Sequence, residues 1–182
     1  MLARAGRSDA FVAIMRRHRD AIYRLICVHV GDADEALDLT QECFAAAYRA
    51  LAQFEVDHSL RGWLARIAIN KCRDWGRRRA VRRFFSFALP LTEALAETLE
   101  DPAPGPYRDL AGREEARRLW AAVALLPPNM KEPLLLSAIE GLSHAEVGAI
   151  LAISEKAVES RLYRARRKLE ALLGDELTDG CV

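Results

Sequence analysis

A strongly basic stretch near the C-terminus carries side chains of the kind that bind polyanions. It reads SEKAVESRLYRARRKL over residues 154–169, and from 156 to 168 it holds six basic side chains against one acid, Glu159. The whole chain of 182 residues has a formal net charge of only +1. Because guanidinium and ammonium groups neutralise the phosphates of nucleic acids, this local charge predicts a nucleic-acid-binding surface.

Helical spacing sorts this stretch into an apolar face and a polar face. The residues that share the apolar face are Val158, Leu162, Ala165 and Leu169. The opposite face carries Lys156, Ser160, Tyr163, Arg164 and Arg167. A helix of about fifteen residues is roughly 22 Å long and fits the major groove of duplex DNA. A simpler interpretation is a solvated basic face that complements the dipole of the helix C-terminus, but it does not explain the turn before the helix.

Turn signals just upstream predict a helix-turn-helix. The sequence SHAE at 143–146 has the form of a capping box, in which Ser143 and Glu146 each bond the other's backbone. We expect a short helix over 143–151, then a turn, then a long final helix capped by Ser154. Two helices joined by a tight turn, the second one basic, are typical of DNA-binding domains.

A second basic block covers residues 59–83, where nine basic side chains stand against one acid. Its apolar stripe consists of Leu60, Trp63, Leu64, Ile67 and Trp75. Arg66, Asn70, Arg73 and Arg77 share the outward face of the same predicted helix. This row predicts a second nucleic-acid surface, with Lys71 nearer the apolar flank. We expect Trp63 and Trp75 to pack in the core rather than to stack on bases.

Most of the chain shows helical spacing of apolar residues, which predicts an all-α fold. The segment DPAPGPY at 101–107 contains three prolines and a glycine, which a helix interior would not tolerate. We therefore expect two small helical domains, 1–83 and 113–182, joined by a linker over 84–112.

Composition limits the classes of function. With 51% hydrophobic residues, no signal peptide and no long apolar run, the chain is expected to be a folded cytoplasmic protein without membrane insertion. The cysteines Cys27, Cys43, Cys72 and Cys181 form no CxxC pair, so neither a metal site nor a disulfide framework is expected. No Gly-rich phosphate loop or catalytic constellation is present, so we expect no enzymatic activity and no cofactor.

Taken together, these segments resemble bacterial sigma factors of the extracytoplasmic-function type, within the sigma-70 family. DLTQECFAAAYR (38–49) is similar to the family's region 2.2, LRGWLARIAINKCRDWGRRR (60–79) to regions 2.3 and 2.4, and residues 125–169 to region 4. The resemblance implies a protein that binds core RNA polymerase and promoter DNA and directs initiation at −10 and −35 elements. It also implies control by an anti-sigma factor, as in a stress response.

The resemblance assigns roles to residues of both domains. The residues that match positions docking on the polymerase clamp are Asp38, Gln41 and Glu42. Those implied in binding and melting the −10 element are Val56, Asp57, His58, Ser59, Arg61, Arg66, Asn70, Lys71, Arg73 and Arg77. The first four of these would form a pocket for a flipped base. Those implied in reading the −35 element are Lys156, Glu159, Ser160, Arg161, Tyr163, Arg164 and Arg167.

Three residues depart from the family's pattern. Glu159 stands where a basic residue is usual, so either the −35 preference differs or the acid only complements the helix dipole. Ala152 takes a turn position usually given to glycine, at a cost of about 1 kcal/mol if its φ is positive. Pro133 falls early in a helix, which we therefore expect to begin near Glu132 with the proline at its first position.

An alternative function is a polymerase-independent helix-turn-helix regulator, which would bind a palindromic operator as a dimer.

For a sigma factor, the linker must join two DNA-reading domains, and a free coil of 29 residues spans only about 30 Å on average. We therefore expect the free protein to be compact, with its basic faces near acidic segments.

Overall fold

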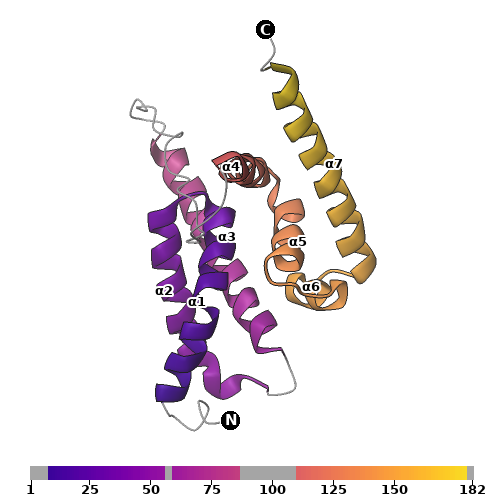
Figure 1. Cartoon of the computed structure of the whole chain (residues 1–182). Coiled ribbons are helices and arrows are strands. Elements are labelled where there is room, and N and C mark those ends of the chain that lie inside the picture. The colour runs from indigo at the N-terminus through magenta and orange to yellow at the C-terminus, as the bar shows by residue number, and fades with distance from the viewer. Residues whose placement is uncertain (1–7, 56–58, 87–109, 180–182) are drawn as a thin grey trace.

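The computed structural model describes residues 8–55, 59–86 and 110–179, and the fold is all-α (Figure 1). The helices are α1 (Ser8–Val30), α2 (Ala33–Ala50), α3 (Leu60–Ser86), α4 (Leu110–Ala124), α5 (Pro128–Ala138), α6 (His144–Leu151) and α7 (Glu155–Asp179). A 3-10 turn, Leu51–Gln53, follows α2. Among the helices described, none combines the length and the apolarity needed to span a bilayer.

Helices α1, α2 and α3 pack together as an N-terminal bundle (Figure 1). Its fully buried side chains include Ile22, Leu25, Ile26, Leu39, Leu64 and Ile69. Gly31, at a φ of +73°, ends α1 in the left-handed region that glycine adopts without strain. Asp32 then caps α2 by accepting a hydrogen bond from the Glu35 N–H at 3.0 Å. The chain reverses direction within these few residues, so two long helices can share one core.

The second group of helices contains the predicted helix-turn-helix. Ser143 and Glu146 form the expected capping box at the start of α6. Ser154 caps α7 by accepting from the Ala157 N–H at 3.2 Å. Val158, Leu162 and Ala165 are buried on the inner face of α7, as the spacing predicts. Both helices and the turn between them are confirmed, although α7 continues to Asp179, well past the predicted fifteen residues.

Helix α5 begins at Pro128, so the expected start near Glu132 is wrong. Pro128 forces the preceding Pro127 into an extended backbone, with φ −56° and ψ 145°, and itself suits the first helical position. Pro133 consequently lies inside α5. There it cannot donate the usual helical hydrogen bond to the carbonyl four residues earlier.

The turn between α6 and α7 depends on two small residues. Ala152 has φ 56° and ψ 47°, which places an L-residue with a Cβ in the left-handed region, as expected from its position. Its N–H donates to the Gly148 carbonyl, which also accepts from the Ile153 N–H at 3.0 Å. A Cβ on Gly148 would lie 2.8 Å from the Ile153 carbonyl oxygen, so the turn requires glycine there.

The two groups of helices are in contact with each other (Figure 1). Helix α1 packs against α4 and α5, and α3 packs against α6. Buried apolar residues of both groups form one continuous cluster. The expected linker 84–112 lies largely outside the described residues, and at its ends α3 extends to Ser86 while α4 begins at Leu110.

Replacing Ala152 with glycine should stabilise the protein. Ala152→Gly should raise the free energy of unfolding by about 0.5–1 kcal/mol, because relief of the left-handed strain exceeds the extra entropy that glycine loses. Chemical denaturation followed by circular dichroism measures this change. Ala149→Gly, at an exposed position of α6, is the matched control and should lower stability by about 1 kcal/mol. A comparable loss in both variants would contradict the strain at Ala152.

Candidate nucleic-acid interface

Helix α7 presents the residues expected to read duplex DNA on one solvent-facing side. The exposed members of this set are Lys156, Glu159, Ser160, Tyr163, Arg164 and Arg167. Arg161 is half-buried at the edge of the face. The Arg164 Nε donates to the Ser160 carbonyl at 3.3 Å, which holds the guanidinium along the helix. The face is therefore open to a groove of DNA and carries both charge and hydrogen-bonding groups.

Glu159 lies on this face, close to the start of α6. Its Oε1 is 3.8 Å from the Nδ1 of His144, and 61% of its side chain is exposed. A contact of this length between exposed groups contributes little to stability. The carboxylate therefore remains accessible to a base edge.

Helix α3 presents the second set, but not all of it faces solvent. Arg66, Asn70 and Arg77 are exposed, and Arg77 pairs with Asp74 on the same helix. Lys71 instead donates to Glu42 on α2 at 2.9 Å. The prediction that Lys71 lies off the outward row is confirmed. The hydrogen bond joins a residue expected to bind DNA, Lys71, to a residue expected to bind polymerase, Glu42.

Arg73 binds a buried carboxylate of the second domain. Its Nε and a terminal guanidinium nitrogen donate to the two oxygens of Glu132 at 2.9 and 2.6 Å. The His29 Nε2 lies 3.6 Å from the same carboxylate, which is beyond hydrogen-bonding distance but within Coulombic contact. Burial alone would raise the pKa of Glu132, but its contacts with His29 and Arg73 outweigh that effect and hold the pKa below its ordinary value. Glu132 is therefore charged at neutral pH.

Arg61 makes a similar contact at the other end of α5. Its Nε donates to Glu140 Oε2 at 2.9 Å, and a terminal nitrogen donates to the Ile139 carbonyl at 3.0 Å. The Glu140 side chain is only 1% exposed, and its other oxygen accepts no hydrogen bond within the described part of the chain. We call Glu132 and Glu140 the carboxylate pair.

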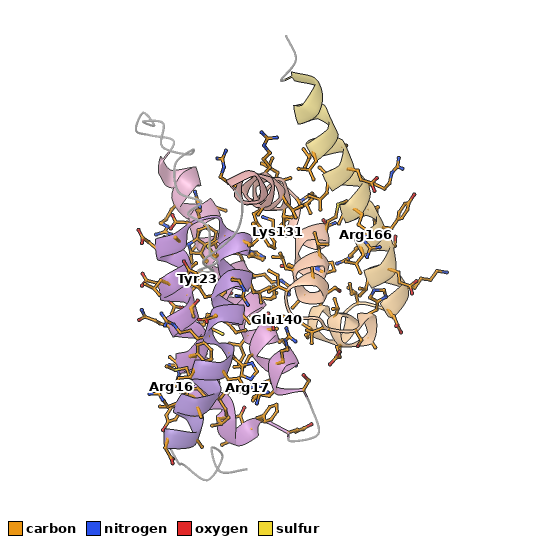
Figure 2. The ribbon with its side chains drawn as sticks, in the orientation of Figure 1. Arg16, Arg17, Tyr23, Lys131, Glu140 and Arg166 are labelled. Carbon is orange, nitrogen blue, oxygen red and sulfur yellow. The ribbon has the colours of Figure 1, made fainter. Side chains whose placement is uncertain are left out.

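Lys131 connects the ends of two helices from different domains. Its Nζ donates to the Ala124 carbonyl at the end of α4 at 2.6 Å and to the His29 carbonyl near the end of α1 at 3.4 Å. Burial lowers the pKa of Lys131 below its usual value, while neighbouring Glu132 opposes that change. An ammonium group at two helix C-termini complements both dipoles. Figure 2 shows Lys131 and Glu140 on the side of α5 that faces α1.

A hollow of about 530 Å³ lies between the start of α3 and helix α6. Its lining includes Trp63, Arg66 and Ser59 from the first domain and Glu146 and Ile150 from α6. The Trp63 ring is only half-buried, and its centroid lies 5.0 Å from that of the Phe54 ring. The hollow therefore combines an aromatic face with a guanidinium group, which suits a base.

The predicted base pocket is only partly described. Val56, Asp57 and His58 lie outside the described residues. Ser59 caps α3, because its Oγ accepts from the Gly62 N–H at 3.2 Å. The expected core position of Trp75 is confirmed, since it is 8% exposed and donates to Glu35 at 2.8 Å.

The acidic face of α2 divides between two hollows. Asp38 and Glu42 line one of about 570 Å³ together with Trp75 and Arg78. Gln41 lines another of about 370 Å³, whose walls include Phe11 and Tyr48. The hydrogen bond to Lys71 holds the pKa of Glu42 below its usual value. The structure therefore brings Asp38 and Glu42 together and places Gln41 on the side nearer α1.

Sequence reasoning did not identify the carboxylate pair, His29 or Lys131 as part of an interface. Glu132 and Glu140 follow no motif, and their partners are 59 and 79 residues away in the chain. The one local signal is that Lys131 and Glu132 occupy positions of α5 whose apolar neighbours predict an inward-facing side chain. Charged residues at such positions are rarely buried unless they are paired.

Two regions of the sigma-70 family match this chain. Residues 14–82 match sigma-70 region 2, and residues 116–169 match sigma-70 region 4. The RNA polymerase sigma factor CnrH of Cupriavidus metallidurans is 39% identical over 175 residues, which cover 94% of this chain and 90% of CnrH. The ECF RNA polymerase sigma factor SigW of Bacillus subtilis is 30% identical over 172 residues, which cover 93% of this chain and 92% of SigW.

Solved structures show the same arrangement of helices. The structure of CnrH in complex with the cytosolic domain of CnrY matches with a TM-score of 0.70 at 32% identity, covering 96% of this chain and 94% of CnrH. The sigma factor RpoE of Bartonella quintana, in complex with the anti-sigma factor NepR, matches with a TM-score of 0.75 at 22% identity, covering 91% of this chain and 97% of RpoE. The latter likeness concerns the fold.

The described cysteines should be unreactive in the folded protein. Cys27, Cys43 and Cys72 are buried, and burial raises the pKa of the Cys43 thiol to about 12 and that of Cys72 further. At about pH 8 these groups are protonated, whereas unfolding restores ordinary thiols that react. Titration with a thiol reagent should therefore modify these three cysteines only in denaturant. Fast modification of Cys43 in the native chain would contradict the packing of α2 on α3.

Proposed function

The chain belongs to the extracytoplasmic-function sigma factors of the sigma-70 family, and we propose that its two DNA-facing helices read the two elements of one promoter. A sigma factor binds core RNA polymerase and directs transcription to specific promoters. It is a transcription initiation factor, and no catalytic role is proposed for this chain.

The observation that carries this function is the presence of both sigma regions in one chain, in the family's order. A helix-turn-helix alone occurs in many regulators. Here it follows a domain whose helix α3 carries a second basic face. Similarity over both domains does not favour a polymerase-independent regulator.

We assign the −10 element to the first domain, residues 1–83, and the −35 element to the last, residues 113–182. In this assignment Arg66, Asn70 and Arg77 contact the melted strand, and Trp63 and Ser59 border the pocket for an unstacked base. The exposed face of α7 enters the major groove. Arg164 lies at the middle of that face, and Arg167 lies one turn further on.

The acidic face of α2 is the proposed contact with core polymerase. A segment with seven acids and one base over residues 31–58 would repel DNA but suits a basic protein surface. Asp38 and Glu42 line a shared hollow and would meet the polymerase together.

An anti-sigma factor is the other proposed partner. RpoE has been solved in complex with the anti-sigma factor NepR, and CnrH in complex with the cytosolic domain of CnrY. We propose that this chain is controlled by a protein of the same kind, and that it acts in the cytoplasm, where its polymerase is.

Run-off transcription with core polymerase tests the proposed function. Templates carrying a candidate promoter should give transcripts only when this chain is added. The variant Gln41→Ala/Glu42→Ala should abolish the transcript and core binding in a pull-down, while stability changes by no more than about 1 kcal/mol. Asp20→Ala, at an exposed position of α1, is the control and should behave as the unaltered chain. Normal core binding by the double variant would exclude this face of α2 as the docking surface.

Two arginines of α7 should have separable roles. Arg164→Ala should cost about 1–3 kcal/mol on the preferred −35 sequence, because an arginine that pairs with a guanine edge reads sequence. Arg167→Ala should weaken binding to all duplexes similarly and reduce the salt slope by about one unit, as loss of a phosphate contact does. Binding to matched and scrambled duplexes over a salt series distinguishes the two. Equal sequence-selective losses in both variants would refute the division.

A further inference from the structure

In the side-chain contacts described, both members of the carboxylate pair bind residues of the opposite domain only. Glu132 contacts Arg73 and His29, and Glu140 contacts Arg61. Both acids belong to the second domain, and all three partners belong to the first. The pair therefore joins the two domains rather than stabilising its own.

The two arginines lie at separate points of the proposed −10 surface. Twelve residues of α3 separate Arg61 from Arg73, which corresponds to about 18 Å along the helix. Arg66 and Asn70, between them, are exposed. The second domain thus contacts Arg73 within the outward row and Arg61 before it, and leaves Arg66, Asn70 and Arg77 exposed.

The geometry at Arg73 is that of a guanidinium bound to a two-oxygen anion. Two parallel hydrogen bonds of 2.9 and 2.6 Å join it to Glu132. Arginine binds carboxylates and phosphates in this same forked manner. A carboxylate in this position therefore competes directly with a DNA phosphate for the same donors.

Resting on the proposed function of α3, we propose that the carboxylate pair is an internal substitute for the −10 DNA backbone. In the free chain Glu132 and Glu140 occupy Arg73 and Arg61. DNA binds this face fully only when the two domains separate. The α3 face is thus occupied by the chain's own second domain until a nucleic acid replaces it.

Helix α6 adds a second obstruction at the same surface. Glu146 and Ile150 form one wall of the hollow that Trp63 and Arg66 line. An unstacked base entering beside Trp63 would meet this wall, and an acid within it would repel the phosphates nearby. The same domain movement that releases the arginines would also open the hollow.

The closed arrangement is suited to reversal. Glu132 and Glu140 side chains are 5% and 1% exposed, whereas Arg73 and Arg61 are 37% and 44% exposed. Burying a carboxylate nearly offsets the attraction of its partner, so such pairs add little net stability compared with the separated, hydrated groups. Competing phosphates can therefore replace the carboxylates at Arg73 and Arg61, although separating the domains also exposes apolar residues of the shared cluster to water.

The test measures binding of the full chain, without polymerase, to a fluorescent single-stranded DNA of mixed sequence about ten nucleotides long. Glu132→Gln/Glu140→Gln keeps side-chain shape and removes both anionic partners. When only a fraction of the molecules is open, the apparent Kd equals the intrinsic Kd divided by that fraction. The variant, which is open more often, should therefore bind about tenfold more tightly. Circular dichroism checks folding, and Glu140→Gln alone should give an intermediate gain.

A matched variant controls for the change in net charge. Asp20→Asn/Glu170→Gln removes two exposed acids elsewhere and should improve binding by less than about threefold, because only general electrostatic attraction changes. Equal affinity of the two double variants, or no gain from Glu132→Gln/Glu140→Gln, would overturn the proposal.

A third variant separates this inference from the proposed function. Arg66→Ala/Asn70→Ala should weaken binding by the unaltered chain and remove most of the gain from the Gln variant. If these alanines weaken binding but the Gln variant gains nothing, the α3 face binds DNA and only the internal substitute is wrong. If the alanines have no effect in either chain, α3 is not the DNA surface and both proposals fail.

Discussion

The structure depends most on the burial of Glu132 between two domains. A carboxylate that is 5% exposed must be compensated, and its partners Arg73 and His29 both belong to the other domain. Lys131 beside it bonds the ends of α1 and α4. The N-terminal end of α5 is thereby fixed against the first bundle, and Arg61 fixes the other end through Glu140. These contacts determine how the domains are oriented.

This orientation treats the two nucleic-acid surfaces differently. The outer face of α7 is turned to solvent and needs no rearrangement to meet duplex DNA. The face of α3 is held at Arg61 and Arg73 by the carboxylate pair. In the proposed assignment, a chain in this state can bind the −35 element but cannot hold a melted −10 strand. The proposed docking residues Asp38 and Glu42 line a hollow that Arg77 of α3 also lines, so the proposed polymerase-facing side of α2 adjoins the basic face of α3.

Local features of the fold followed from the sequence, and long-range pairs did not. Apolar spacing predicted the inner face of α7, and the capping residues Ser143 and Ser154 predicted where α6 and α7 begin. The start of α5 that Pro133 predicted was wrong, because the Pro127–Pro128 step begins the helix earlier. Expected compactness agrees with the contacts between the domains, and Glu42 of the acidic segment 31–58 pairs with Lys71 of the basic block as expected. The acids that join the two domains were not expected: Glu132 lies in α5 and Glu140 follows it. A pair such as Arg61 and Glu140, 79 residues apart, depends on how the domains pack, which no local pattern encodes.

The distance between the domains tests the account most directly. Spin labels at Arg24→Cys on α1 and Glu170→Cys on α7, both exposed, can be attached once Cys181 is replaced by serine, because the described native thiols are buried. Pulsed electron resonance should give one short distance in the free chain and a clearly longer one in the complex with core polymerase and promoter DNA. The longer distance already dominating in the free chain would contradict the closed arrangement held by Glu132 and Glu140.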